Sequence, residues 1–167
     1  MNAASRRDAN AGTLDTGFLE GTLGFTIRLC QLNVFDDFID RLSGLDLRPA
    51  EFSILCLIAD NPGCRASRIA ECLCIKRPNF VPLLSGLEQR KLVVRRRSEA
   101  DGRFQDLFLT ALGRRVVTKA KSVVAEQEQY MADRLGPRKR DELVNALRTV
   151  ARLDLRADRE GWRVKES

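Results

Sequence analysis

Clustered arginines are the residues of this chain best placed to do chemistry. Three of them are consecutive, at positions 95–97, and Arg103 follows just after the turn-forming pair Asp101-Gly102. A guanidinium group carries a permanent charge and presents its N–H donors in a planar fork, which suits phosphate and carboxylate oxygens. Side chains alternate between faces along a strand, so at most two of the three consecutive arginines address one surface. This arrangement predicts anion binding.

The overall composition favours a polyanionic partner and excludes several kinds of enzyme. The 167 residues include 29 Lys and Arg against 23 Asp and Glu, a net charge of +6, and nucleic acid is the commonest anionic partner of a compact basic protein. The chain contains no histidine, so Ser-His-Asp and Cys-His catalysis are excluded and the commonest zinc ligand is missing. We therefore expect a protein that is not an enzyme and that holds neither a metal nor a cofactor.

The arginines are predicted to lie on a β-hairpin that follows a series of helices. Residues 92–97 and 105–110 have the pattern of two strands, joined by a polar connection whose Asp101-Gly102 is a strong turn signal. Apolar periodicity predicts helices over residues 24–45, from Pro49 to just before Asn61, briefly from about Ala66, over 77–91, over 111–135, and after the Gly136-Pro137 break. We expect residues 1–22, which show no sustained period, to form a flexible arm.

Each predicted helix carries an apolar face that we expect to be buried. In the helix over 77–91 the apolar residues follow the i, i+3, i+4, i+7 spacing of a buried stripe. The residues expected to point inward are Ile27, Val34, Phe35, Phe38, Ile39, Leu42 and Leu45; Phe80, Leu83, Leu84 and Leu87; Leu112, Val116, Val117, Ala120, Val123, Val124, Met131 and Leu135; and Leu143, Leu147, Val150 and Leu153.

The order of these elements predicts a winged helix-turn-helix within a mainly α-helical protein that has a small antiparallel β-wing. Three short helices are followed by a two-stranded ribbon. In such a fold the helix before the ribbon enters the major groove of DNA, and the tip of the ribbon reaches the adjacent backbone or minor groove. The alternative is that the arginines only keep an exposed hairpin edge soluble.

Over residues 25 to 155 the sequence also resembles the MarR-type transcription regulators. The residues that carry the resemblance are Leu47-Arg48-Pro49-Ala50-Glu51-Phe52, Asn61-Pro62-Gly63, Ile69-Ala70, the run from Leu87 to Val93, Asp101-x-Arg103 and Leu109-Thr110. The resemblance implies that Asp101 holds Arg103 in place. It also implies a homodimer that binds a pseudo-palindromic double-stranded DNA operator, because the symmetry of the protein and that of the site go together.

Three regions follow from this resemblance. Residues 1–22 form the arm, residues 23–46 and 111–160 form a helical dimerisation lobe, and residues 47–110 form the winged DNA-binding region. The candidate DNA contacts lie on three elements of that region. They are Ser67 and Arg68 at a helix start, Arg77, Pro78, Asn79 and Pro82 on the following helix, and Arg95, Arg97, Asp101 and Arg103 on the wing.

The predicted recognition helix departs from the usual pattern of the family because it contains two prolines. Asn79 can pair with adenine and Arg77 with guanine, and proline rings can touch thymine methyl groups. Pro78 fits the first turn, whereas Pro82 predicts a local distortion because an internal proline removes a backbone hydrogen bond. We therefore expect few direct base contacts. Ser67 and Arg68 suit phosphate binding at a helix start, or form an ordinary solvated helix end.

The sequence leaves several kinds of effector open. The family responds to small anionic or phenolic ligands, to acyl-CoA thioesters, or to oxidants. Arg28 is a candidate anchor for a carboxylate or phosphate, or else a surface or dimer-interface charge. Cys30 and Cys64 are the candidate redox-sensing thiols, with Cys64 expected to be the best exposed, since sensing requires an accessible thiol of lowered pKa.

The function expected is that of a ligand-responsive, dimeric, DNA-binding transcription regulator of the repressor type, with an aromatic acid or its CoA thioester as a possible effector. One alternative is a winged-helix protein-interaction module without DNA binding, suggested by the two prolines. Another is a thiol-based, oxidant-sensing regulator. The sequence shows neither an apolar run of 18 residues nor a secretory signal, so we expect a cytoplasmic protein without a membrane segment.

Overall fold

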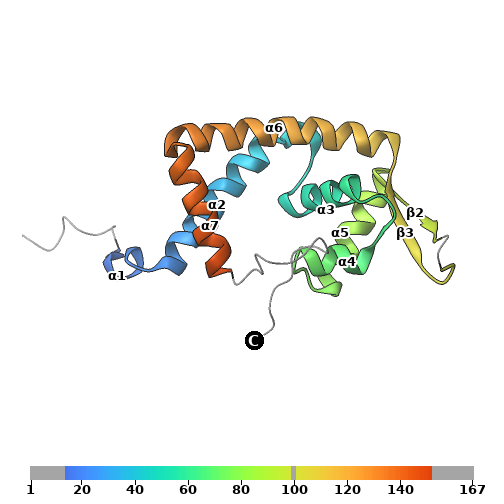
Figure 1. The fold of residues 1–167 in the computed structure, drawn as a ribbon, viewed down its shortest axis with the longest axis horizontal. Coiled ribbons are helices and arrows are strands. Elements are labelled where there is room, and N and C mark those ends of the chain that lie inside the picture. The colour runs from blue at the N-terminus through green and yellow to red at the C-terminus, as the bar shows by residue number, and fades with distance from the viewer. Residues whose placement is uncertain (1–13, 99–100, 152–167) are drawn as a thin grey trace, which may run out of the picture. The chain divides into compact units, whose positions relative to one another are not determined.

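The computed structural model describes residues 14–98 and 101–151 of the chain (Figure 1). The chain separates into two compact units, residues 1–37 and residues 38–167, and each is described by itself. Within the described residues, no helix combines the length and the apolar character needed to span a bilayer.

The first unit contains two helices, α1 (Gly17–Glu20) and most of α2 (Leu23–Arg41). The helical turn α1 lies within the segment predicted to be a flexible arm, and residues 1–13 of that segment lie outside the described part. The Asp15 carboxylate accepts a hydrogen bond from the Gly17 N–H at 3.0 Å. Free N–H groups at a helix start are commonly satisfied in this way.

The predicted first helix is shorter than expected. Helix α2 ends at Arg41, and a 3-10 turn, η1 (Ser43–Leu45), follows it. Ser43 and Gly44 have low helix propensity, and Asp46 then takes a left-handed conformation with φ of 48°. The chain therefore turns before α3 begins.

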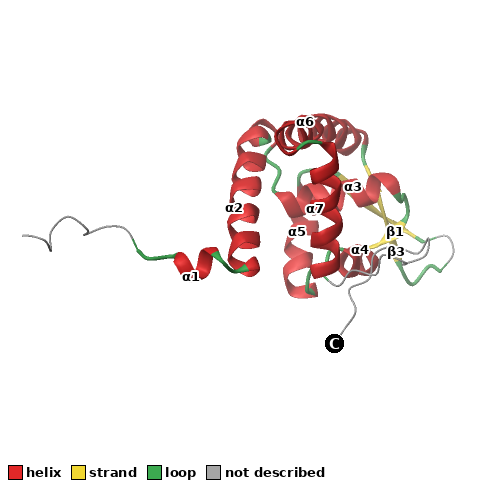
Figure 2. Ribbon diagram, turned by 60° about the vertical axis from the view of Figure 1, so that its left-hand side comes forward, coloured by secondary structure: helices red, strands yellow, loops and turns green. Residues whose placement is uncertain are grey.

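The second unit contains the remaining elements (Figure 2), and the order of its helices and of the hairpin matches the prediction. Helix α3 (Pro49–Asp60) starts with proline in its first turn, where the missing N–H costs no helical hydrogen bond. The other elements are β1 (Cys64–Arg65), α4 (Ala66–Cys72), α5 (Arg77–Gln89), β2 (Val93–Arg97), β3 (Gln105–Leu109), α6 (Ala111–Leu135) and α7 (Pro137–Val150). The predicted bounds of α3 and α6 are confirmed, α5 ends two residues before its predicted end, and the predicted starts of α4 and α7 are confirmed.

The sheet has three strands in the order β1-β3-β2, all antiparallel, where the sequence predicted two. In the expected hairpin, Val93 lies opposite Leu109 and Arg97 opposite Gln105. The third strand, β1, places Arg65 opposite Asp106. A strand of two residues is too short to leave a periodic signal, which is why the sequence did not reveal it.

The core of the second unit is aliphatic and lies between the helices and the inner face of the hairpin. Its buried residues come from the end of α2, from α3, α4, α5, β2 and β3, and from the first half of α6, and α6 lies along α3 (Figure 1). The core contains Phe38, Leu42, Leu47, Ile54, Leu55, Ile58, Ile69, Phe80, Leu84, Leu87, Leu92, Val93, Leu107, Leu109, Val117 and Ala120. The stripe predicted on α5 is confirmed, with Leu83 half-buried.

Several apolar residues predicted to be inward are exposed in the single chain. These expectations are corrected for Phe35, Ile39, Leu112, Leu135, Leu143, Leu147 and Val150. Helix α7 packs against α6, yet all three of its described apolar positions predicted as inward stay open to solvent. Periodicity identifies an apolar face but not what covers it. Leu153 lies outside the described residues.

The start of α6 is held tightly against the start of β2. The Thr110 N–H donates to the Leu92 carbonyl at 3.0 Å, and the Thr110 hydroxyl donates to the Lys91 carbonyl at 2.7 Å. That hydroxyl also accepts from the Gly113 N–H at 2.9 Å and so caps α6. A Cβ atom at Gly113 would lie 2.0 Å from the Leu92 carbonyl oxygen. Only glycine fits this contact without displacing the backbone.

Replacing Gly113 therefore has a predictable cost. Gly113→Ala forces α6 away from the hairpin, and we expect the free energy of unfolding to fall by about 1–3 kcal/mol, as for other overpacked sites. The measurement is urea unfolding followed by circular dichroism at fixed protein concentration. The matched control is Gly86→Ala in α5, where an added Cβ meets nothing within 4 Å and stability should stay level or rise by up to about 1 kcal/mol. Equal effects of the two substitutions would contradict the prediction.

Candidate nucleic-acid interface

Helices α4 and α5 form the predicted helix-turn-helix, joined by residues 73–76. The turn is held by two backbone hydrogen bonds, from Cys74 N–H to the Glu71 carbonyl at 3.0 Å and from Ile75 N–H to the Ala70 carbonyl at 2.9 Å. Cys74 takes a left-handed conformation with φ of 53°. Helix α5 then begins at Arg77. The turn therefore determines which side of α5 faces the core and which side faces solvent.

The exposed side of α5 carries the residues predicted to meet DNA bases. Arg77, Pro78, Asn79 and Pro82 are all exposed. The expected distortion at Pro82 does not divide the helix, which runs from Arg77 to Gln89 with Pro82 inside it. The hydrogen bond that Pro82 removes is the one to the carbonyl of Pro78, in the first turn. The surface that α5 offers is therefore a helical face on which two of the exposed side chains are proline rings.

Arg95 binds the recognition helix itself. Its Nε and Nη2 groups donate to the two carboxylate oxygens of Glu88 on α5, at 2.6 and 3.0 Å. The hydrogen bond that Arg95 donates to the Glu88 carboxylate raises the pKa of Arg95. Two parallel hydrogen bonds of this kind fix orientation as well as distance. Arg95, predicted as a DNA contact, is thus engaged in holding the wing to α5.

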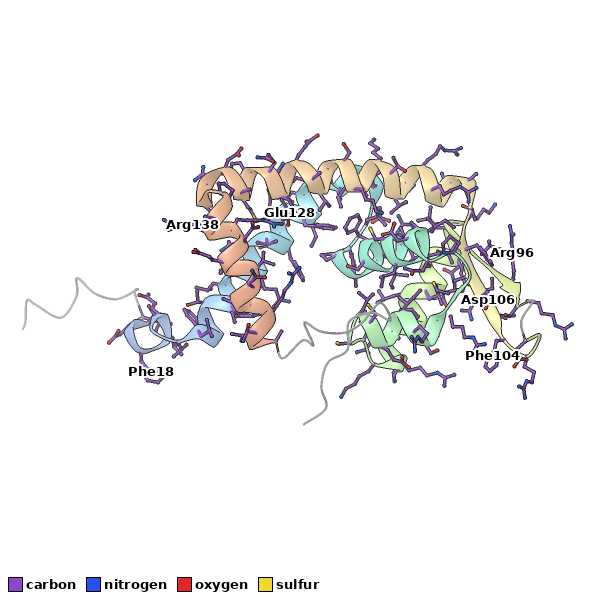
Figure 3. The ribbon with its side chains drawn as sticks, in the orientation of Figure 1. Phe18, Arg96, Phe104, Asp106, Glu128 and Arg138 are labelled. Carbon is purple, nitrogen blue, oxygen red and sulfur yellow. The ribbon has the colours of Figure 1, made fainter. Side chains whose placement is uncertain are left out.

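The other two consecutive arginines have different partners. The Arg96 guanidinium lies over the Phe108 ring, 5.0 Å from its centre. Arg97 Nε donates to the Gly102 carbonyl at 3.0 Å, across the hairpin connection. A Cβ at Gly102 would lie 2.7 Å from Arg97 Nε, so glycine keeps room for this side chain. Figure 3 shows Arg96, Asp106 and Phe104 along the ribbon.

The connection of the hairpin closes with a β-turn over residues 101–104. The Phe104 N–H donates to the Asp101 carbonyl at 3.0 Å. The Asp101 carboxylate accepts from the Arg103 backbone N–H at 3.1 Å and from Arg103 Nε and Nη2 at 3.0 and 2.8 Å. These hydrogen bonds hold the pKa of Asp101 below its usual value. The expectation that Asp101 holds Arg103 in place is confirmed, and Arg103 nevertheless remains 84% exposed.

The start of α4 is exposed beside the sheet. Ser67 and Arg68 lie in its first turn, and Arg65 precedes it as the N-cap residue. Arg65 also ends β1, so one residue joins the helix-turn-helix to the wing. Three features here escaped sequence reasoning: the pairing of Arg95 with Glu88, strand β1, and the Arg65 guanidinium, which lies over the Phe104 ring at 3.9 Å from its centre. Partners in different elements leave no signal in spacing alone.

Known proteins identify the family of this fold. A model of the MarR family matches residues 45–103. A putative transcriptional regulatory protein for the hcr operon of Thauera aromatica is 30% identical over 139 residues, which are 83% of this chain and 84% of the relative. The chain belongs to the MarR family.

Solved structures show the same architecture as this MarR-family chain. The transcriptional repressor CouR bound to a 23-mer DNA duplex is 42% identical, with a TM-score of 0.79 over 84% of this chain and 99% of CouR. CouR bound to p-coumaroyl-CoA is 41% identical, with a TM-score of 0.78 and the same coverage. MepR of S. aureus in a DNA complex, 22% identical with a TM-score of 0.71 over 78% of this chain and 95% of MepR, shares the fold. The predicted winged helix-turn-helix is confirmed.

A cavity of about 550 Å³ lies between α4 and α5 of this MarR-family chain and reaches Arg95 on β2. Its wall combines apolar side chains such as Phe80 and Ile75 with the cationic groups of Lys76, Arg77 and Arg95. The lining also includes the carboxylate of Glu71, and Arg95 is already paired with Glu88. Arg28, the predicted ligand anchor, is exposed on α2 in the first unit and is not part of this cavity's lining.

The cysteines are all free, and burial lowers the reactivity of three of them. Cys64, expected to be well exposed, is half-buried, and desolvation raises its pKa. Burial raises the pKa of Cys56 from 9.0 to about 11 and also raises that of Cys72. Cys30 is exposed on α2. Among the described residues no group of three His, Cys, Asp or Glu could hold a metal ion.

Thiol modification checks these environments. Because the thiolate is the reacting form, the shift of the Cys56 pKa from 9.0 to about 11 lowers its alkylation at pH 8 by about a hundredfold relative to an unperturbed cysteine. Its rate should rise about tenfold per pH unit up to about pH 11, as long as the fold persists. The measurement is peptide-level mass spectrometry during iodoacetamide treatment, with exposed Cys30 as the internal standard. Alkylation of Cys56 as fast as Cys30 would show that the burial is wrong.

Proposed function

We propose that this MarR-family chain is a DNA-binding transcription regulator that acts as a repressor in the cytoplasm. The observation that carries the proposal is its 42% identity, over 84% of its length, to the repressor CouR as solved on a DNA duplex. The geometry of the wing supports it independently. The Asp101 carboxylate orients the Arg103 guanidinium, which stays mostly in solvent and can therefore meet an anion.

The exposed apolar faces support a homodimer. On α7, Leu143, Leu147 and Val150 repeat with the spacing of one helical face, and each is at least 39% exposed. Soluble monomers seldom leave a continuous apolar face in water, and such faces mark interfaces. A two-fold dimer would present two wings and two α5 helices to successive turns of a pseudo-palindromic operator.

Arg103 gives the sharpest test of DNA binding. Arg103→Ala removes the exposed cation at the wing and should weaken operator binding about tenfold, within the range of one strong phosphate or base contact, and should reduce the salt dependence. Fluorescence anisotropy with a duplex enriched by the wild-type protein from random sequences measures both. Arg138→Ala is the matched control. The Arg138 side chain is 85% exposed on α7, and its replacement removes the same charge.

Two outcomes would contradict this role of the wing. Equal losses from Arg103→Ala and Arg138→Ala would assign the effect to net charge alone. The absence of any salt-dependent duplex binding by the wild-type protein would favour the second candidate function, a winged-helix module that binds proteins, which the exposed Pro78 and Pro82 on α5 favour.

The effector we propose is an aromatic acyl-CoA thioester. CouR, 41% identical over 84% of this chain, has been solved with p-coumaroyl-CoA. An acyl-CoA combines an apolar acyl group with phosphates, and the chain's excess of cations suits it. Oxidant sensing through Cys64 has less support, because burial raises the pKa of that thiol. Exposed Cys30 keeps a thiol-based response as an alternative.

A thermal-shift assay tests the effector. A ligand that binds only the folded state stabilises it by mass action, so p-coumaroyl-CoA at about 100 times its Kd should raise the Tm by about 5 °C or more. Free CoA and p-coumaric acid are the controls and should give smaller shifts. A thioester no better than free CoA would exclude recognition of the aromatic acyl group.

A further inference from the structure

Phe104 at the wing lies among charged side chains rather than in the core. It is 42% exposed and is not part of the buried cluster. The Arg65 guanidinium lies 3.9 Å from the centre of its ring, and that of Arg103 lies 6.0 Å from it. The face of an aromatic ring carries negative potential and attracts cations at these distances. The ring therefore gathers two guanidinium groups from different parts of the chain.

The position of the Phe104 ring is fixed by its own backbone. Its N–H donates to the Asp101 carbonyl at 3.0 Å, and its carbonyl accepts from the Ser98 N–H at 3.0 Å, on the opposite side of the hairpin connection. The first hydrogen bond closes the β-turn over residues 101–104, and the second pairs Phe104 with Ser98 across the hairpin connection. The backbone that carries the ring is consequently fixed within the hairpin.

Arg65 reaches the ring from β1, the strand that flanks β3 on the edge opposite β2. It ends β1, where it is paired with Asp106 of β3, and it is the N-cap residue of α4. Its positive charge also contributes to the lowered pKa of Asp101. Arg65 and Arg103 thus share two neighbours, one aromatic and one acidic. The group joins the turn of the wing to the helix start that carries Ser67 and Arg68.

We propose that Phe104 is a positioning residue for DNA binding, whose ring holds Arg65 and Arg103 on one surface so that both guanidinium groups meet the backbone of the same duplex. The inference rests on the proposed function and assigns Arg65 as a further DNA contact. Free arginine side chains sample many rotamers, and ordering them costs binding free energy. A ring that restrains them beforehand reduces this cost without adding charge.

The test compares Phe104→Leu with Phe104→Tyr in the full chain. Leucine keeps an apolar side chain but has no π face, whereas tyrosine retains it. From the strength of exposed cation–π contacts, Phe104→Leu should weaken binding about two- to fivefold and Phe104→Tyr should stay within about twofold of the wild type. Phe18→Leu, at an aromatic residue 87% exposed in α1, is the matched control and should leave affinity unchanged. The probe is a duplex enriched by the wild-type protein, and unfolding curves show that each variant is folded.

A second arm separates positioning from direct contact. If Phe104 acts through the two arginines, Phe104→Leu should have no further effect on affinity in an Arg65→Ala, Arg103→Ala background. In the wild-type background, Phe104→Leu should also reduce the salt dependence of DNA binding, since the variant holds fewer phosphates. A full-sized effect of Phe104→Leu in the background lacking both arginines would mean that the ring touches DNA or supports the fold, and would overturn the proposal.

The failure of this inference and that of the proposed function are distinguishable. Wild-type binding that is unchanged by Phe104→Leu overturns the role of Phe104 alone. Tight wild-type binding that Arg65→Ala does not weaken overturns the assignment of Arg65. The absence of salt-dependent binding by the wild type overturns the proposed function and this inference with it.

Discussion

The contact between the start of α6 and the start of β2 determines the placement of the wing. The Leu92 carbonyl accepts from Thr110 at 3.0 Å, and Gly113 lies so close to that carbonyl that no side chain fits. Because Leu92 directly precedes β2 and Thr110 lies between β3 and α6, this one contact closes the base of the hairpin and aligns these three elements. Buried Leu92, Leu107 and Leu109 then anchor the inner face of the strands. The tip of the wing depends on this base for its direction.

Toward the tip, polar and aromatic contacts replace apolar packing. The pairing of Arg95 with Glu88 connects the hairpin to α5, Asp101 orients Arg103, and Phe104 lies beneath Arg65. Exposed ion pairs of this kind contribute little to stability, typically 0.2–1 kcal/mol. Their effect is on side-chain order, which matters for a surface that must match regularly spaced phosphates. The basic residues of the wing therefore divide into those that hold the structure together and those that remain open to a ligand.

The sequence predicted most of the fold because its signals are local. Proline at position 49, the stripe of Phe80, Leu84 and Leu87, and Asp101-Gly102 each mark an element by spacing or turn chemistry, and the structure confirms them. Contacts between distant residues were missed, since nothing in the chain states that Arg95 meets Glu88 or that Arg65 meets Phe104. Exposure of Leu143 and Leu147 was also missed. Periodicity records that a face is apolar but cannot distinguish an intramolecular neighbour from a second subunit.

Strand β1 fixes the length of the connection between α3 and α4, because it pairs with β3 in one register. The Gly63 N–H donates to the Leu107 carbonyl at 2.9 Å, and the next two residues pair with Leu107 and Asp106. Successive residues of a strand face opposite sides, so inserting or deleting one residue before β1 would rotate Arg65 away from the ring it covers. Within residues 61–63 the number of residues is therefore constrained, and so is the glycine at position 63, whose φ of 84° disfavours other residues.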